Sequence, residues 1–104
     1  MLELAKECQN LDVFCQVSTC YVNCNRSGYI DEVIYDHKTN VQDHVQKIMS
    51  MNIQEIKDKE SELISGFPNT YTFTKNLAEK NIKNNMGNVK VIIFRPAIIA
   101  SAWN

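Results

Sequence analysis

Short apolar blocks alternate with polar segments along the chain, and their spacing predicts its secondary structure. Residues 2–9 are rich in good helix formers and predict a short helix. Residues 11–18 form an apolar, β-prone run that fits a buried strand. Residues 22–29 contain the Asn, Ser and Gly typical of a loop, whereas residues 30–36 fit either a short strand or an extended loop.

Helical periodicity dominates the middle of the chain. Between residues 41 and 64, apolar side chains recur mostly at three- and four-residue steps, separated by Gln, Lys, Asp and Glu. A break at residues 50–52 divides this stretch into two helices, and Gly66 and Pro68 stop the second one. The apolar positions of this pattern are Val41, Val45, Ile48, Met49, Ile53, Ile56, Leu63 and Ile64.

A further helix follows the Gly and Pro break. Asn69 or Thr70 can cap a helix that begins at Thr70 or Tyr71 and runs to about Met86. Gly87 is a good residue for the position just beyond its end. The candidates for its buried side are Phe73, Leu77, Ala78 and Ile82.

The last regular element is a β-branched run, Val89–Phe94, which Arg95-Pro96 ends. Two apolar strands joined through helices predict an α/β fold with a parallel, right-handed βαβ connection. Parallel strands need cover on both faces and neighbours on both sides, which two strands cannot supply. We therefore expect this chain to be a piece of a larger α/β domain, with unpaired strand edges that tend to self-associate.

Composition narrows the function classes. The chain has 104 residues, 11 Lys and Arg, 12 Asp and Glu, and a formal net charge of −1. This balance argues against a nucleic-acid binder, which would usually have a pI above about 9. No apolar run approaches the roughly 18 residues of a membrane span. The N-terminus is mixed polar rather than a signal peptide, so we expect an intracellular protein.

Neither the cysteines nor the histidines predict a metal site. The cysteines have no CxxC spacing, and disulfides are rare in reducing compartments, so we expect free, mostly buried thiols. His37 and His44 lie in a polar stretch without a third ligand nearby, which favours surface positions. The four cysteines are Cys8, Cys15, Cys20 and Cys24.

Tyr71 and Lys75 form the most informative pair. Residues four apart on a helix lie on one face, and an ammonium beside a phenol favours the phenolate, which suits general acid chemistry at neutral pH. Such a pair occurs in many helices by chance. Three features strengthen it. Ser18-Thr19 ends the first strand, where open α/β sheets place their ligands. Arg95-Pro96 ends the second strand, and residues 66–70 lead into the helix.

Three separated blocks together resemble a known family. A strand ending in Ser/Thr, a Tyr-x-x-x-Lys helix and a strand ending in Arg-Pro resemble the extended short-chain dehydrogenase/reductase superfamily, a Rossmann-like α/β fold. Within it, the blocks look like the reductase domain of alcohol-forming fatty acyl-CoA reductases, the male-sterility protein family. The blocks are VSTCYVNCNRSGYIDEVIY (17–35), GFPNTYTFTKNLAEK (66–80) and VIIFRPAII (91–99).

The resemblance implies catalytic roles for four residues. Tyr71 would be the general acid that protonates the carbonyl oxygen as hydride arrives. Lys75 would favour ionisation of Tyr71 and hydrogen-bond the nicotinamide ribose. The hydroxyl partner would be Thr19 or Ser18, and Thr19 is favoured because the superfamily's hydroxyl sits a residue beyond the strand end.

The resemblance also implies a cofactor and a substrate. The cofactor would be NADPH, and the backbone after Arg95-Pro96, at Ala97 and Ile98, would run beside the nicotinamide. Two hydrides would take a long-chain acyl-CoA to an aldehyde and then to a primary alcohol. Full-length members are commonly attached to peroxisomal or endoplasmic-reticulum membranes.

One family feature is missing. Family members begin with a Gly-rich turn that binds the cofactor's pyrophosphate, and Gly28, Gly66 and Gly87 lie too far apart to build one. We therefore expect residues 1–104 to be the C-terminal part of a Rossmann-like reductase domain, inactive alone. The alternatives are a non-catalytic remnant or partner-binding fragment, and a related reductase acting on another carbonyl.

Overall fold

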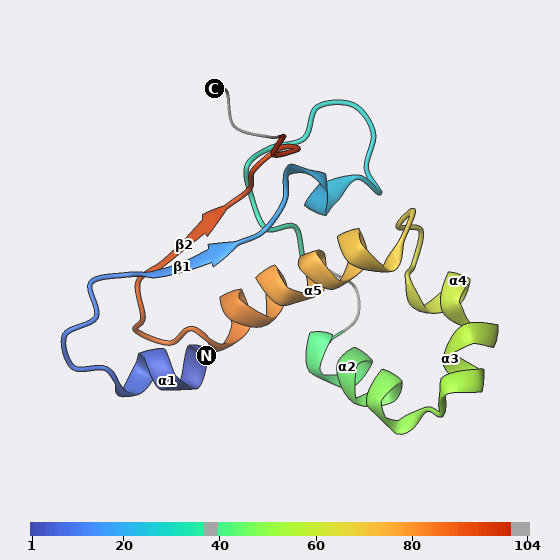
Figure 1. Ribbon diagram of the computed structural model, residues 1–104, viewed down its shortest axis with the longest axis horizontal. Coiled ribbons are helices and arrows are strands. Elements are labelled where there is room, and N and C mark those ends of the chain that lie inside the picture. The colour runs from blue at the N-terminus through green and yellow to red at the C-terminus, as the bar shows by residue number, and fades with distance from the viewer. Residues whose placement is uncertain (37–39, 101–104) are drawn as a thin grey trace.

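The computed structural model describes residues 1–36 and 40–100 (Figure 1). The expected surface position of His37 therefore falls outside the described residues. The described part contains a two-stranded sheet, five α-helices and one 3-10 turn. In chain order these elements are α1 (Leu2–Glu7), β1 (Phe14–Val17), η1 (Cys20–Asn23), α2 (Val41–Ser50), α3 (Ile53–Asp58), α4 (Glu60–Leu63), α5 (Thr70–Asn85) and β2 (Val91–Phe94).

The two strands pair in parallel, as the βαβ pattern predicts. Phe14 lies opposite Val91, and Val17 lies opposite Phe94. Beyond the strand ends the ladder continues, because the Cys20 amide donates to the carbonyl of Pro96 at 3.0 Å. The chain thus places the carboxyl ends of both strands side by side, next to the residues that follow them.

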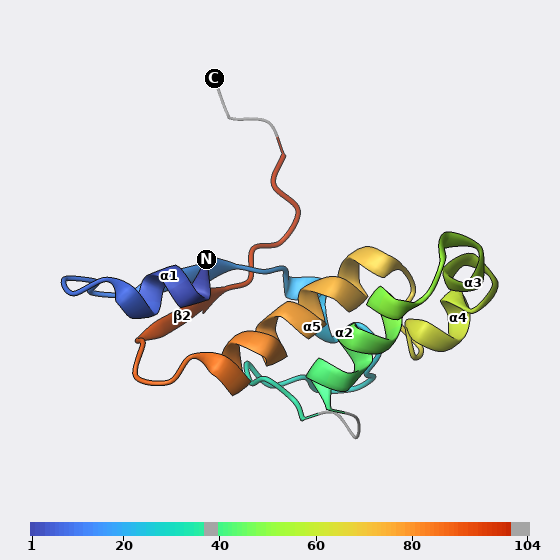
Figure 2. The same ribbon diagram turned by 90° about the horizontal axis from the view of Figure 1, so that it is seen from below.

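Burial alternates along both strands, as the pleat requires. Val91 and Ile93 are half-buried and line a cavity together with Ile82 of α5. Ile92 and Phe94 point to the other face and are exposed. Figures 1 and 2 show α5 running alongside the strands and partly covering one face of the sheet. The apolar side chains of the other face are exposed.

The predicted break in the middle of the chain is confirmed, and a second break follows it. Met51 ends α2, and Asn52 caps α3 through a capping box with Glu55. Lys59 then separates α3 from α4, which makes three helices where the pattern predicts two. The apolar positions do not share one buried face, since Met49 is 80% exposed.

The helix α5 matches the sequence prediction at both ends. The Asn69 side chain accepts a hydrogen bond from the Thr72 amide, and Gly87 follows the helix end with a φ of +57°. Phe73 and Ile82 are buried. Phe73 packs edge-on against Phe67, with 5.8 Å between ring centres. The buried apolar residues are Ala5, Val22, Val41, Leu63, Phe67, Phe73 and Ile82.

The cysteine expectation is half wrong. All four thiols are free, but all four are exposed rather than buried. Cys15 alternates with the half-buried Phe14 and Gln16 and therefore lies on the exposed sheet face. Cys20 and Cys24 lie at the start and just past the end of η1, whose buried positions are Val22 and Asn23. A small apolar side chain is buried only where another element covers it.

Candidate functional site

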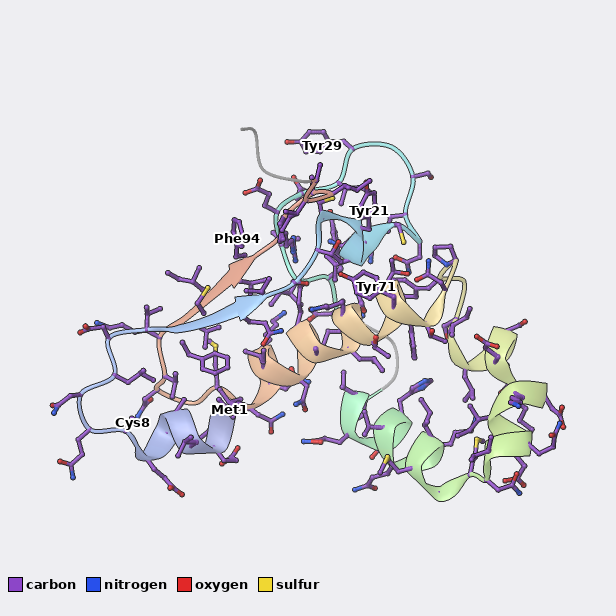
Figure 3. The ribbon with its side chains drawn as sticks, viewed as in Figure 1. Met1, Cys8, Tyr21, Tyr29, Tyr71 and Phe94 are labelled. Atoms are coloured by element: carbon purple, nitrogen blue, oxygen red, sulfur yellow. The ribbon has the colours of Figure 1, made fainter. Side chains whose placement is uncertain are left out.

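The first turn of α5 carries the candidate acid. Tyr71 is the second residue of the helix, and its side chain is 55% exposed (Figure 3). Lys75 lies one turn later, with its Nζ 5.9 Å from the centre of the Tyr71 ring. The structure therefore places the ammonium and the phenol on one helix face, as the four-residue spacing predicts.

Lys75 also ties the helix to the sheet. Its Nζ donates a hydrogen bond of 3.0 Å to the carbonyl of Val17, the last residue of β1. These two residues are 58 positions apart in the sequence. The bond fixes the Tyr71–Lys75 face beside the carboxyl end of β1, one residue before Ser18.

Ser18 and Thr19 are both buried, but their hydroxyls differ in their contacts. Thr19 caps η1, because its Oγ1 accepts a hydrogen bond of 3.3 Å from the Tyr21 amide. Ser18 is 3% exposed, and among the described residues its Oγ is the buried side-chain polar atom that lacks a hydrogen-bond partner. Thr19 keeps its own proton to donate, so both hydroxyls stay candidates.

Arg95 makes a partly buried ion pair that cannot be predicted from the sequence. Its Nε donates to Glu79 Oε1 at 2.9 Å, and its Nη2 donates to Glu79 Oε2 at 2.7 Å. The same Nη2 donates to the carbonyl of Val33 at 2.9 Å. Glu79 is only 1% exposed. The hydrogen-bonded Glu79 carboxylate raises the pKa of Arg95 above its usual value, so the guanidinium stays protonated.

The segment after Arg95 remains accessible. Pro96 is half-buried, with its carbonyl bound to the Cys20 amide, whereas Ala97 and Ile98 are exposed. The Arg95 side chain is paired with Glu79. At this strand end, a ligand could therefore reach the exposed residues Ala97 and Ile98 more readily than the Arg95 side chain. Whether these residues bind a cofactor stays a prediction.

Sequence reasoning missed the buried polar residues of α5, among them Glu79 and Asn76. Glu79 lies four residues after Lys75 and therefore continues the face of Tyr71 and Lys75. Asn76 is buried and donates to the carbonyl of Val22 at 3.0 Å, which ties α5 to η1. The sequence carries no signal that singles out Glu79, because most residues of this helix are polar.

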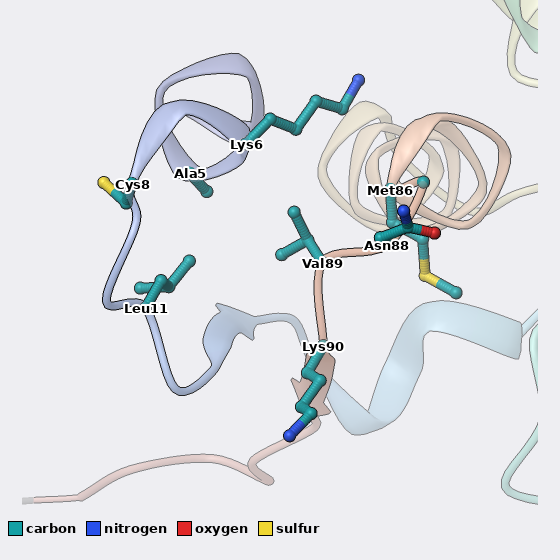
Figure 4. Close-up of a pocket in the computed structure, with 9 residues that line it drawn as sticks. Ala5, Lys6, Cys8, Leu11, Met86, Asn88, Val89 and Lys90 are labelled. Atoms are coloured by element: carbon teal, nitrogen blue, oxygen red, sulfur yellow. The ribbon is translucent and has the colours of Figure 1, made fainter.

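A separate cavity lies far from these residues. Figure 4 shows it between α1 and the turn that joins α5 to β2, with a volume of about 420 Å³. Its walls include Ala5, Leu11 and Val89. Met86 also lines it, at the opposite end of α5 from Tyr71, so the cavity is not part of the candidate site.

The described residues contain neither a metal-binding cluster nor a membrane-spanning helix. Residues 1–36 and 40–100 contain no group of three His, Cys, Asp or Glu side chains arranged to hold a metal ion. In the same ranges, no helix is both long enough and apolar enough to cross a membrane.

Comparison with known proteins identifies the class. The NAD-binding profile described as "Male sterility protein" matches residues 1–103. The chain is 36% identical over 103 residues to fatty acyl-CoA reductase 1 of Xenopus laevis, covering 99% of this chain and 20% of that protein. It is 38% identical over 106 residues to fatty acyl-CoA reductase 2 of Mus musculus and 34% identical over 103 residues to a putative fatty acyl-CoA reductase, CG8306, of Drosophila melanogaster, with the same coverage. No solved structure matches the chain significantly.

The fold and the matches together define a Rossmann-like α/β segment of an NAD-binding domain family. The chain belongs to the male sterility protein family, whose members matched here are named fatty acyl-CoA reductases. It spans about a fifth of the length of these curated relatives.

Proposed function

We propose that this chain carries the catalytic groups for NADPH-dependent reduction of long-chain fatty acyl-CoA to fatty alcohol, in a domain of the extended short-chain dehydrogenase/reductase type. One observation carries the proposal. Lys75 lies beside Tyr71 and donates to Val17 at the carboxyl end of β1, directly before Ser18 and Thr19. This arrangement supports a proton donor, a cation and hydroxyl donors gathered at one sheet edge.

The described residues fit the nicotinamide end of the cofactor. The Lys75 ammonium has three protons, of which one is used by the Val17 carbonyl, so others are free to bind ribose hydroxyls. The Ser18 hydroxyl is buried without a partner, which suits a group that donates to a ligand. When bound, NADPH would supply hydride to the carbonyl carbon of the substrate.

Side chains of this chain would stabilise and then neutralise the negative charge on the substrate oxygen. Negative charge develops on this oxygen as hydride adds to the carbonyl carbon, and hydrogen-bond donors lower the barrier. Thr19 or Ser18 would donate to the oxygen, and Tyr71 would deliver its proton there. Lys75 would stabilise the resulting phenolate. After the first hydride addition, the CoA sulfur would leave as the thiol with the proton that Tyr71 delivered, and Tyr71 would regain a proton from solvent. A second hydride, from a second NADPH, would then add to the aldehyde, and the same residues would protonate its oxygen to give the alcohol.

We further propose that the pyrophosphate of the cofactor is bound by residues outside this chain, which then forms the C-terminal part of the reductase domain. Gly28 follows η1, Gly66 precedes α5 and Gly87 follows it, all with positive φ in separate turns. None of them directly follows a strand, which is where a Gly-rich turn would hold phosphates.

A segment exchange tests this proposal. This chain replaces the aligned 103 residues of the Xenopus laevis fatty acyl-CoA reductase 1, and the chimera receives NADPH and palmitoyl-CoA. We expect NADPH oxidation with hexadecanol as product. Tyr71→Phe should abolish product while leaving NADPH binding nearly intact, and Lys75→Met should weaken both. A folded chimera without turnover, or a Tyr71→Phe chimera with full turnover, would contradict the proposal.

A second candidate function rests on the exposed sheet face. Val17, Ile92 and Phe94 are each more than half exposed, and each strand has one hydrogen-bonded neighbour among the described residues. We infer that the isolated chain self-associates through this face and its edges. Sedimentation of the wild-type chain against Phe94→Lys tests this. Equal monomeric behaviour of both would argue against it.

A further inference from the structure

Three side chains on one face of α5 are spaced four residues apart: Tyr71, Lys75 and Glu79. The first is the candidate acid, and each of the other two reaches a different strand. Lys75 bonds the Val17 carbonyl at the end of β1, and Glu79 binds Arg95, the residue directly after β2. The acid-bearing helix is therefore fastened to both strand ends by polar contacts.

The ion pair of Glu79 and Arg95 has a geometry that restrains both side chains. The two parallel N–H···O bonds of 2.9 and 2.7 Å fix the relative orientation of carboxylate and guanidinium, unlike a single contact. Arg95 also holds the loop before α2 through the Val33 carbonyl at 2.9 Å. The pair thus joins three segments: α5, the end of β2, and the loop.

We propose that Glu79 and Arg95 are positioning residues for the reduction. Their ion pair holds Tyr71 at a fixed place relative to the end of β2 at Pro96. This inference rests on the proposed function. Lys75 and Asn76 tie α5 to the end of β1 and to η1, and the Glu79–Arg95 pair adds the contact at the end of β2 that fixes the helix relative to both strands. Neither Glu79 nor Arg95 needs to touch the substrate for this role.

The positional effect is measurable without any activity. The Cys20 amide donates to the carbonyl of Pro96, next to Arg95, whereas the Phe14 amide donates to Lys90 at the other end of the sheet. In Glu79→Gln, the carboxylate charge is lost and the strand end loosens. We expect hydrogen exchange of the Cys20 amide to rise about tenfold in the 104-residue chain while that of Phe14 changes less than about twofold.

One further variant and one control complete this exchange test. Arg95→Lys keeps the charge but removes the bidentate geometry, so it should reproduce the selective exchange at Cys20. Glu62→Gln removes the exposed partner of Lys47 and should change neither amide. Equal acceleration of Cys20 and Phe14, or no acceleration of either, would overturn the positioning role.

Kinetics in the chimera separate positioning from simple stability. We expect Glu79→Gln to lower kcat per folded molecule by about tenfold or more, because small misplacement of an acid is costly, with KM for palmitoyl-CoA nearly unchanged. An unchanged kcat per folded molecule overturns the proposal. If the unmodified chimera is inactive, the proposed function fails instead, and exchange at Cys20 alone decides whether the pair holds the strand end.

Discussion

Replacing Asn69 with alanine should loosen the turn of α5 that carries Tyr71. The Asn69 Oδ1 accepts a hydrogen bond of 2.9 Å from the Thr72 amide, which has no partner within the helix at this position. Thr72 is buried, so water replaces the lost acceptor poorly. Loss of an N-cap costs about 0.5–2 kcal/mol, and burial places this one at about 1–2 kcal/mol.

Matched substitutions at the same position isolate the cap. Asn69→Asp keeps the acceptor oxygen and adds a negative charge at the helix N-terminus, so its free energy of unfolding should stay within about 0.5 kcal/mol of wild type. Asn69→Gly should lose only a few tenths of a kcal/mol, because glycine is itself tolerated at this position. The expected order of stability is therefore Asp and Asn, then Gly, then Ala.

Urea unfolding followed by far-ultraviolet circular dichroism measures this order. With a urea dependence of about 2 kcal/mol per molar, a typical value for a small protein, the Asn69→Ala midpoint should fall by roughly 0.5–1 M. Equal midpoints for Asn69→Ala and Asn69→Asp would refute the reasoning, because these variants differ in the acceptor oxygen that the cap requires.

Two further perturbations test the core and the loop before α2. Phe73→Ala removes a buried ring that packs edge-on against Phe67 and should lower the free energy of unfolding by about 3–5 kcal/mol, measured by the same urea method. A loss below about 1 kcal/mol would mean that this core is not formed. The Lys83 ammonium donates a hydrogen bond of 2.7 Å to the Asp36 carboxyl and lowers the pKa of that carboxyl. The pair therefore stabilises the fold at neutral pH. This stabilisation is lost as the pH falls through the lowered pKa of Asp36. Lys83→Met should raise the pKa of Asp36 toward its ordinary value in an NMR titration, and an unchanged titration would contradict the pairing.

Local signals explain why much of the fold is readable from the sequence. Asn69 at the start and Gly87 at the end set the bounds of α5, because a cap and a positive φ are properties of single residues and their neighbours. The parallel pairing of β1 and β2 follows from two apolar runs separated by helices. The second break, at Lys59, has no comparable Gly or Pro signal and was missed.

Long-range contacts explain what the sequence did not reveal about the site. The pair spacing predicts that Tyr71 and Lys75 share a helix face, and the structure confirms it. The partner of Lys75, the Val17 carbonyl, lies 58 residues away and is a backbone atom, which carries no sequence signature. Likewise Glu79 reads as an ordinary helix residue until the fold brings Arg95 against it.

The sequence by itself determined the element types, the α/β class, the family resemblance and the candidate residues, because these depend on periodicity, caps and short motifs. Only the tertiary structure decided which of the candidate groups are already hydrogen-bonded or ion-paired to other parts of the chain. It directs the Arg95 side chain to Glu79, assigns Thr19 to a cap, and leaves the buried Ser18 hydroxyl without a partner in the described part of the chain. It also leaves Cys15 exposed. Burial and pairing are properties of what lies opposite a side chain, and that is set by the path of the whole chain.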